Sequence, residues 1–300
     1  MEYNMLGRTG FKVSKLGLGG APLGGDFGET SDAQVIDVVH AAIDLGINFI
    51  DTAPLYGRGE SERRIGLALK GKRNQVILAT KAVLRGDPYT FENTIQSVEA
   101  SLLRLQTDCI DLIQLHELEM TNWEQAVTET LPAFQKLKEQ GKVRAIGVNA
   151  GRIELLLPFV KAGLVDTIQT FARYTLIDHS AKDELLPLAW KQQIGVINGS
   201  ALAMGILADN PAPFLRNNTT LLDEAERRKQ LLQFLRKTEP KGLIEPAMRF
   251  SLSCPEIAVT LTGTTSVRSL ELNASYCDGL GLTEEEMAQL FSLFAEQTLF

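Results

Sequence analysis

The sequence predicts a single α/β domain, spanning residues 1–300, in which eight parallel strands close into a barrel surrounded by helices. Three observations predict this fold. Short apolar segments alternate with amphipathic helical segments along the chain, as in successive βα units. No linker, charge run or low-complexity tract divides the chain. Its 300 residues also fit a barrel of this kind, which takes about 250. An open, doubly wound sheet is the alternative arrangement of the same units.

The predicted strands are near-continuous apolar runs, which are typical of strands buried on both faces of a parallel sheet. In chain order they are Lys15–Gly20, Asn48–Ala53, Val76–Lys81, Ile110–His116, Val143–Asn149, Thr167–Phe171, Gly195–Ala201 and Ile257–Gly263. The residues before the first strand resemble a short hairpin with its turn at Arg8–Gly10. The last two strands are unusually far apart because of a Pro/Asn-rich stretch, Met204–Leu222, and we expect this long loop to be a lid.

Helices are predicted between the strands, two of them with clear start signals. Ser31 or Asp32 caps Ala33–Leu45, and Asn122 precedes Trp123–Glu139 with a glutamine placed to complete a capping box. The other predicted helices are Glu62–Leu69, Phe91–Leu105, Arg152–Ala162, Lys182–Lys191, Glu224–Arg236 and Val267–Tyr276, with a last helix, Glu284–Ala295, following Thr283.

Composition excludes several classes of protein. Lys plus Arg total 30 against 37 for Asp plus Glu, so the net charge of −7 argues against nucleic acid as a partner. No apolar run is long enough for a membrane span, and the N-terminus lacks a signal-peptide pattern. The three cysteines, Cys109, Cys254 and Cys277, have no CxxC spacing, which favours a reducing compartment. We therefore expect a cytoplasmic protein, as a monomer or weak homo-oligomer, that acts on a small molecule.

Polar residues stand at the C-terminal ends of three predicted strands, where barrel enzymes carry their chemistry. Asp51 ends the second strand and is followed by Tyr56 on its loop, Lys81 ends the third, and His116 ends the fourth. Each alone has an ordinary structural explanation, such as a cap or core packing. A lysine ending a buried strand is harder to explain, because an unpaired buried ammonium is costly. Asp51, from the adjacent strand, is its natural partner, so together the four residues favour function.

These four residues can move a proton to or from an oxygen atom. Tyrosine has a pKa near 10, and we expect the ammonium of Lys81, held by Asp51, to lower the pKa of Tyr56. A tyrosine tuned in this way can protonate a carbonyl or deprotonate an alcohol, while His116 orients the same oxygen. None of the four is a good covalent nucleophile, and we expect no metal, because His116-Glu117 lacks a second histidine at zinc-site spacing. The residues predict a proton relay paired with a hydride from elsewhere.

These four residues and the segments around them resemble those of the aldo-keto reductase superfamily. The matching segments are Asp51–Gly57, Ala79–Lys81, Leu115-His116, Gly195–Leu202 and Gly263–Asn273. The resemblance implies an (α/β)8 barrel with a nicotinamide cofactor extended over the strand ends. It also implies that Tyr56 is the general acid/base, Lys81 and Asp51 its tuning pair, and His116 the carbonyl-orienting residue.

A closer likeness is to the branch of L-galactose and aldose 1-dehydrogenases, which oxidise the anomeric hydroxyl of a sugar to a lactone with NAD. The segments that carry it are Gly17–Gly25, His116–Glu119, Glu129–Lys142 and Ala201–Ile206. The resemblance therefore implies oxidation of an aldose such as L-galactose, L-fucose or D-arabinose. The alternatives are an NADPH-dependent reductase of aldehydes and ketones and a non-catalytic, cofactor-sensing subunit.

The resemblance also implies a set of cofactor-binding positions. They are Gly20, Asn149, Gln169, Ser200, Leu202, Gly263, Thr264, Thr265, Ser266, Arg268, Ser269 and Asn273. Gln169 matches the glutamine that bonds the nicotinamide amide, and Ser200 and Leu202 match positions near the pyrophosphate. The chain departs from most relatives in having Asn149-Ala150 in place of Ser-Asn and Gly199 in place of a stacking tyrosine.

NADPH-using relatives have Lys and Arg where this chain has Gly263 and Ser269. A 2′-phosphate needs such cations, so their absence favours NAD, whereas the neighbouring Arg268 keeps NADP open. Ser266 also suits the N-cap of a helix, and helix N-termini favour anions. Asn273 matches the adenine contact. Five loop residues are candidate contacts for the substrate, with plain packing as the alternative: Leu55, Tyr89, Met120, Trp123 and His179.

Overall fold

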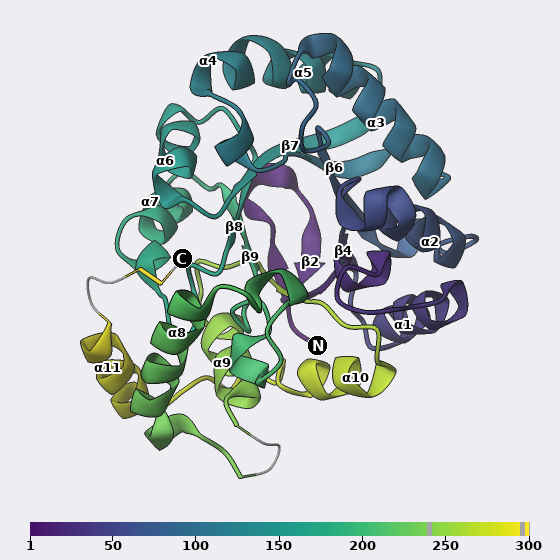
Figure 1. The fold of residues 1–300 in the computed structure, drawn as a ribbon. Helices are drawn as coiled ribbons and strands as arrows, with labels where there is room; N and C mark the ends of the chain where they lie inside the picture. The colour runs from purple at the N-terminus through teal and green to yellow at the C-terminus, as the bar shows by residue number, and fades with distance from the viewer. Residues whose placement is uncertain (239–241, 295–297, 300) are drawn as a thin grey trace.

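Eight parallel strands close into a barrel in the order β10-β3-β4-β5-β6-β7-β8-β9, so the last strand of the barrel, β10, pairs with its first, β3 (Figure 1). This computed structural model describes residues 1–238, 242–294 and 298–299. The strands are β3 (Leu16–Gly19), β4 (Phe49–Asp51), β5 (Ile77–Ala82), β6 (Ile110–Leu115), β7 (Val143–Ala150), β8 (Thr167–Phe171), β9 (Gly195–Gly199) and β10 (Val259–Thr262). Each overlaps a strand predicted from the sequence. The closed barrel confirms the predicted fold class and excludes the open sheet.

The strands are apolar throughout because both of their faces are covered. All six residues of β6 are buried, for example. Outward-facing side chains pack under the helices, whereas Phe49, Leu112 and Ile197 belong to a separate cluster that fills the barrel interior. Because side chains alternate along a strand, the residue two positions further along points into the same interior. This alternation places a polar layer above the apolar one.

The N-terminal hairpin closes one end of the barrel. It pairs β1 (Tyr3–Met5) with β2 (Lys12–Ser14) in antiparallel register, as the sequence predicts, and a 3₁₀ turn at Gly7–Thr9 joins them. Three buried side chains of this segment join the interior cluster: Leu6, Phe11 and Val13. The approach is close enough that a Cβ atom at Gly7 would lie 2.2 Å from the backbone nitrogen of Gly195.

Helices surround the barrel, and most of the predicted ones are present. Their bounds are α1 (Asp32–Asp44), α2 (Glu60–Ala68), α3 (Phe91–Leu105), α4 (Trp123–Gln125), α5 (Leu131–Glu139), α6 (Ile153–Ala162), α7 (Leu185–Lys191), α8 (Thr219–Leu231), α9 (Ile244–Leu252), α10 (Val267–Ser275) and α11 (Glu284–Leu293). Ser31 caps α1 in a full capping box with Gln34, and Thr283 caps α11 in the same way.

Three helix predictions need correction or comment, and one helix was not predicted. The segment Trp123–Glu139 is interrupted by a π-helical turn, Ala126–Thr130, between α4 and α5. The predicted helix Glu224–Arg236 begins earlier, because Asn218 accepts a hydrogen bond from the Leu221 amide and caps α8. The helix α9 was not predicted; Pro246 lies in its first turn, where proline is tolerated. The last residue of the predicted terminal helix, Ala295, lies outside the described residues.

The long segment after β9 is more ordered than the predicted loop. It contains short 3₁₀ turns at Ile206–Ala208 and Pro213–Leu215, and the buried side chains of the first turn join the core. Phe214 is exposed and meets Phe27, from the connection after β3, edge to face with ring centroids 6.1 Å apart. The segment therefore reaches across to the loop of another strand at the C-terminal end of the barrel.

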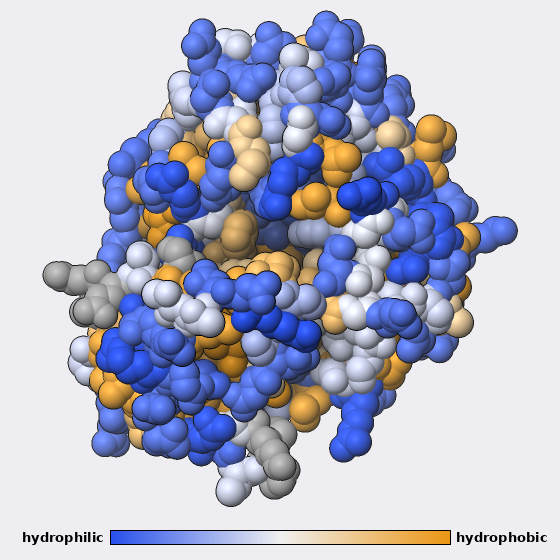
Figure 2. Space-filling view, in the orientation of Figure 1, coloured by the Kyte–Doolittle hydropathy of each residue, from blue (hydrophilic) through white to orange (hydrophobic). Residues whose placement is uncertain are grey.

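Hydrophilic side chains cover much of the outside of the helices, and the face in view is hollowed at its centre (Figure 2). None of the helices in the described ranges is both long and apolar enough to cross a membrane.

Candidate active site

A polar layer lies in the barrel interior directly above the apolar cluster. Asp51, Lys81 and Gln114 each follow an interior apolar residue (Phe49, Ala79 and Leu112) by two positions. The strand alternation therefore turns all three side chains into the barrel, close to the C-terminal ends of β4, β5 and β6. All three are buried.

The ion pair expected between Lys81 and Asp51 is present at the centre of this layer. Lys81 Nζ donates hydrogen bonds to Asp51 Oδ2 and to the carbonyl oxygen of Thr52, each at 2.7 Å. Asp51 also accepts from Gln114 Nε2 at 3.0 Å, through Oδ1, and from Gln169 Nε2 at 3.3 Å, through Oδ2. Donors from three strands thus hold the carboxylate, which compensates for removing both charges from water.

Tyr56 and His116 complete the group. Lys81 Nζ lies 4.9 Å from the centroid of the Tyr56 ring, and the Tyr56 and His116 rings meet nearly perpendicularly with centroids 6.0 Å apart. The His116 amide donates to the Ala82 carbonyl at 2.8 Å, and the Tyr89 hydroxyl donates to the His116 carbonyl at 2.9 Å. The structure therefore brings together the four residues singled out from the sequence.

Burial and charge set the protonation of this group. Burial alone would lower the pKa of Lys81, but Asp51 and Tyr56 raise it above its usual value, so the ammonium stays charged. Burial raises the pKa of Tyr56, and the opposing charge of Lys81 does not cancel this effect. Lys81 does act to lower the pKa of Tyr56, but the net shift is upward. The expectation of a pKa below the usual value of tyrosine is therefore wrong. The dense surroundings disfavour the phenolate, and the carboxylates of Asp51 and Glu117 add to the effect.

His116 is neutral near pH 7. Burial lowers its pKa well below the usual value, and the positive charges of Lys81 and Arg85 lower it further. Its Nδ1 atom is buried and has no hydrogen-bond partner within the described ranges. A neutral imidazole at this position can exchange a hydrogen bond with an oxygen atom of a bound molecule.

The polar layer has a free acceptor suited to an amide ligand. Gln169 Oε1 is buried and makes no hydrogen bond to any described residue, while its amide nitrogen contacts Asp51. A nicotinamide carboxamide could donate to this oxygen, so Gln169 fits the nicotinamide cofactor expected from the sequence. Asn149 differs, because its Oδ1 accepts from the Glu117 amide at 3.3 Å and its Nδ2 donates to the Gln169 carbonyl at 3.2 Å. The Asn149 side chain thereby joins the C-terminal ends of β6, β7 and β8.

The segment before α10 presents hydroxyl groups and a helix N-terminus. Ser266 caps the helix by accepting from the Ser269 amide at 3.3 Å, and its own amide donates to Thr264 Oγ1 at 3.0 Å. The exposed positions of the segment are Gly263, Ser266, Arg268 and Ser269, and Thr264 and Thr265 are half-buried. Asn273, by contrast, is buried and donates to Thr262 Oγ1 at 2.7 Å.

Left-handed backbone at residues other than glycine is concentrated near the C-terminal strand ends. Ser200, Ala203 and Met204 follow β9 with φ of 59°, 49° and 52°, and Glu117 follows β6 with φ of 51°. Such conformations cost energy and persist where the surrounding structure requires them. The half-buried Leu202 lies between Ser200 and Ala203. Gly20 lies nearby, where its amide donates to the Asp51 carbonyl at 2.7 Å.

The five candidate substrate contacts occupy different environments. Leu55 is half-buried beside Tyr56, and Met120 is exposed. Tyr89 is buried with its hydroxyl on the His116 carbonyl, and burial raises its pKa to about 12. Trp123 packs on Phe159 of α6 with ring centroids 4.8 Å apart.

His179 is buried among three aromatic rings of α9 and the C-terminal segment: Phe250, Phe291 and Phe294. Neither ring nitrogen has a hydrogen-bond partner within the described ranges, and burial lowers the pKa of His179 to about 4. The rings that it contacts lie in the outer helical layer of the fold.

Two features of the site were not found from the sequence. Gln114 bonds Asp51 from the middle of an apolar strand, and its position two residues after Leu112 and two before His116 was the available signal. The ion pair between Arg85 and Glu117 joins the loops that follow β5 and β6. Loop conformation brings this pair together, and no spacing rule predicts it.

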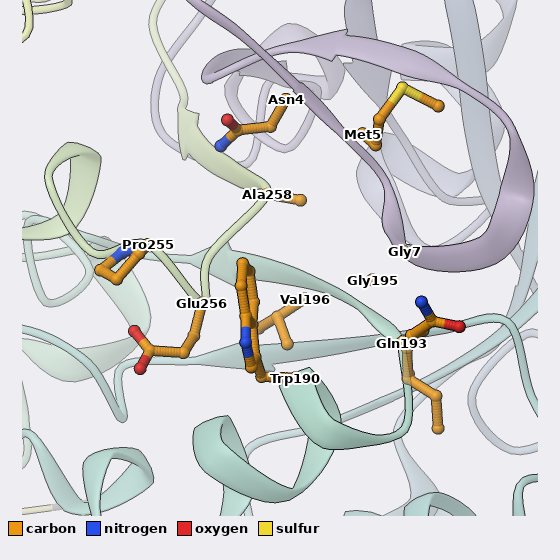
Figure 3. A pocket seen from close by; sticks show the side chains of 11 residues that line it. Asn4, Met5, Gly7, Trp190, Gln193, Gly195, Val196, Pro255, Glu256 and Ala258 are labelled. Atoms are coloured by element: carbon orange, nitrogen blue, oxygen red, sulfur yellow. The ribbon is translucent and has the colours of Figure 1, made fainter.

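A cavity of about 370 Å³ lies elsewhere, near the N-terminal ends of β9 and β10 and beside the hairpin (Figure 3). Its labelled lining residues include Trp190, Glu256 and Asn4. Because the polar layer lies at the C-terminal strand ends, this cavity is separate from it. In the described part of the chain, no group of His, Cys, Asp and Glu residues is placed to hold a metal ion.

The sequence and the fold of this chain match an oxidoreductase family. Residues 15–294 match the aldo/keto reductase family, and the chain therefore belongs to it. L-galactose dehydrogenase of Arabidopsis thaliana is 35% identical, with 97% of this chain and 93% of that protein covered. D-threo-aldose 1-dehydrogenase of a Pseudomonas species is 32% identical, with 67% and 70% covered. The holo form of aldo-keto reductase AKR11C1 from Bacillus halodurans has a TM-score of 0.80 at 28% identity, covering 98% of this chain and 96% of that one. These relatives confirm the resemblance found in the sequence.

Proposed function

We propose that this chain oxidises an aldose at C1 to the lactone and passes the hydride to NAD. The observation that carries the proposal is the buried pair of Lys81 and Asp51 beside Tyr56, with His116 at the edge of the tyrosine ring. Two of the similar proteins are named for the oxidation of a sugar, which supports an aldose as the substrate.

In this proposal Tyr56 is the general base that takes the proton from the anomeric hydroxyl. Lys81 stabilises the phenolate that must form first, since burial opposes that charge and the ammonium favours it. Asp51 keeps Lys81 charged and in place. His116, which is neutral, holds the reacting oxygen by a hydrogen bond.

When bound, a nicotinamide supplies the carbon that accepts the hydride. Gln169 would hold its carboxamide through the unpartnered Oε1. Ser200 and Leu202 would lie along the pyrophosphate, and the segment Gly263–Ser269 at the N-terminus of α10 would hold the adenosine end. Asn149 and Asn273 have their side-chain amides engaged within the protein, so we assign them to shaping these subsites.

A second candidate function is the NADPH-dependent reduction of aldehydes and ketones. The observation that favours it is Arg268, which is exposed beside Ser269 and makes no ion pair within the described ranges. A guanidinium there is free to contact a 2′-phosphate. The lack of a cation at Gly263 and Ser269 still favours NAD.

The test is to mix the purified protein with NAD and each of L-galactose, L-fucose and D-arabinose and to follow absorbance at about 340 nm. We expect a rise with at least one sugar and its loss in Tyr56→Phe. No rise with any sugar would refute the proposal. A strong preference for NADPH with simple aldehydes would instead select the second candidate. Turnover that survives unchanged in Tyr56→Phe would exclude this site as its source and favour a cofactor-sensing role.

A further inference from the structure

Arg85 and Glu117 form a two-bond ion pair at the end of the barrel that carries the polar layer. Arg85 lies on the loop after β5, and Glu117 directly follows His116 after β6. Arg85 Nε donates to Glu117 Oε2 at 2.8 Å, and Nη2 donates to Oε1. The Glu117 side chain is only 14% exposed, whereas that of Arg85 is 52% exposed. The carboxylate of Glu117 is therefore largely buried, and the guanidinium of Arg85 lies on its solvent-exposed side.

The pair is fixed against the candidate active site. The same two loops are joined a second time by the hydrogen bond from the Tyr89 hydroxyl to the His116 carbonyl. The Glu117 amide donates to Asn149 Oδ1, which ties it to β7 as well. The charges reach the reacting groups, since Glu117 contributes to the raised pKa of Tyr56 and Arg85 to the lowered pKa of His116.

Structure alone gives little reason for a glutamate at this position. Its φ of 51° is left-handed, a conformation that glycine or asparagine adopts at lower cost. An ion pair whose arginine is half exposed contributes little to stability. Residues held in such conformations cluster at functional sites, so the side chain itself is the feature that calls for an explanation.

The pair keeps unused hydrogen-bonding capacity. Each carboxylate oxygen of Glu117 accepts one hydrogen bond from Arg85, and a carboxylate oxygen can accept two. The remaining guanidinium nitrogen of Arg85, Nη1, donates to no group within the described ranges. Acceptors and a donor side by side match adjacent hydroxyl groups, each of which both donates and accepts. An unsubstituted alkyl chain offers no hydrogen bond to either group.

We propose that the Arg85–Glu117 pair binds hydroxyl groups next to the reacting carbon and makes the enzyme selective for hydroxylated aldehydes and sugars over unsubstituted ones. The inference rests on the proposed function, because it names the substrate class of the same site. Glu117 accepts from one hydroxyl while Arg85 donates to its neighbour. A site that bonds a hydroxyl discriminates strongly against an analogue that lacks it.

The test compares two aldehydes of equal chain length, glyceraldehyde and propanal, of which only the first has hydroxyls beside the carbonyl. Reduction of each is measured with the preferred reduced cofactor for wild type, Glu117→Gln and Arg85→Gln. We expect wild type to favour glyceraldehyde in kcat/KM, and each variant to reduce that preference about tenfold or more, with KM for L-galactose rising in parallel. The ratio cancels any effect of the lost charge on Tyr56, because that effect is common to both aldehydes.

The matched control is Glu184→Gln, which breaks an exposed pair with Lys161 of α6, both side chains 58% exposed. We expect its preference, thermal midpoint and cofactor affinity to equal those of wild type. An active wild type without a preference for glyceraldehyde, or variants that keep the wild-type ratio, would overturn the inference and leave the proposed function standing. A wild type that turns over neither sugars nor aldehydes would reject both.

Discussion

The buried ion pair permits a sharp prediction about stability from the substitution Asp51→Asn. The side chains of Lys81 and Asp51 are 0% and 2% exposed, so removing one charge leaves the other without compensation in the interior. Breaking such a pair costs about 3–5 kcal/mol of unfolding free energy. An asparagine also has one acceptor oxygen in place of two, so one of the donors from Lys81, Gln114 and Gln169 meets an NH₂ group. The Thr52 carbonyl still accepts from Lys81, and we therefore expect a loss of about 3–4 kcal/mol.

The pH dependence of that loss has a definite sign. The folded-state pKa of Lys81 is raised, so the stability that the pair contributes is complete below the unfolded-state pKa of lysine and disappears as pH rises through the folded-state value. The difference between wild type and Asp51→Asn should therefore narrow at strongly alkaline pH.

Urea denaturation followed by circular dichroism, at neutral pH and at about pH 11, measures this difference. Glu184→Gln is the control and should change the unfolding free energy by less than about 0.5 kcal/mol, because its pair is exposed. A loss below about 1 kcal/mol for Asp51→Asn at neutral pH would refute the reasoning, since the desolvated ammonium would then have found another counter-charge.

Three further predictions concern activity. Tyr56→Phe should lower kcat/KM by about a thousandfold or more with no change in the circular dichroism spectrum, and an active variant would contradict its assignment as the base. Sugar oxidation should speed up as pH rises from about 7, because burial raises the pKa of Tyr56 and the base must be deprotonated; a kcat profile that falls over this range would contradict that direction. Gln114→Leu should reduce kcat about tenfold, because Asp51 Oδ1 loses its donor, whereas Gln114→Asn, with a shorter amide, should retain more activity. Equal kcat in all three proteins would remove Gln114 from the positioning of Asp51.

Much of the fold could be predicted because its signals are local. A strand such as β6, covered on both faces, must be apolar throughout, and that pattern is visible in six consecutive residues. The helix α9 was not predicted; it contains Pro246 in its first turn, where a proline removes no intrahelical hydrogen bond. The start of α8 depends on the cap at Asn218, which lies in a stretch whose composition indicates a loop.

In the candidate site, too, the features visible in single segments could be predicted, and those that depend on packing could not. The meeting of Asp51, Tyr56, Lys81 and His116 could be predicted because polar residues at the ends of apolar strands are visible in single segments of the sequence. The direction of the pKa shift of Tyr56 could not, because it is a balance between burial and the charge of Lys81 that only the packed structure sets. The two asparagines expected at the cofactor, Asn149 and Asn273, have internal hydrogen-bond partners on neighbouring segments, which no sequence pattern identifies.

The N-terminal hairpin has a consequence for how ligands bind and leave. Because Leu6, Phe11 and Val13 fill the opposite end of the barrel, that end offers no route to the polar layer through the described residues. In the proposed reaction, cofactor, sugar and product would therefore enter and leave at the C-terminal ends of the strands. A sugar bound above the cofactor would then block the cofactor's exit. The hairpin therefore favours an order of binding in which the cofactor binds first and is released last.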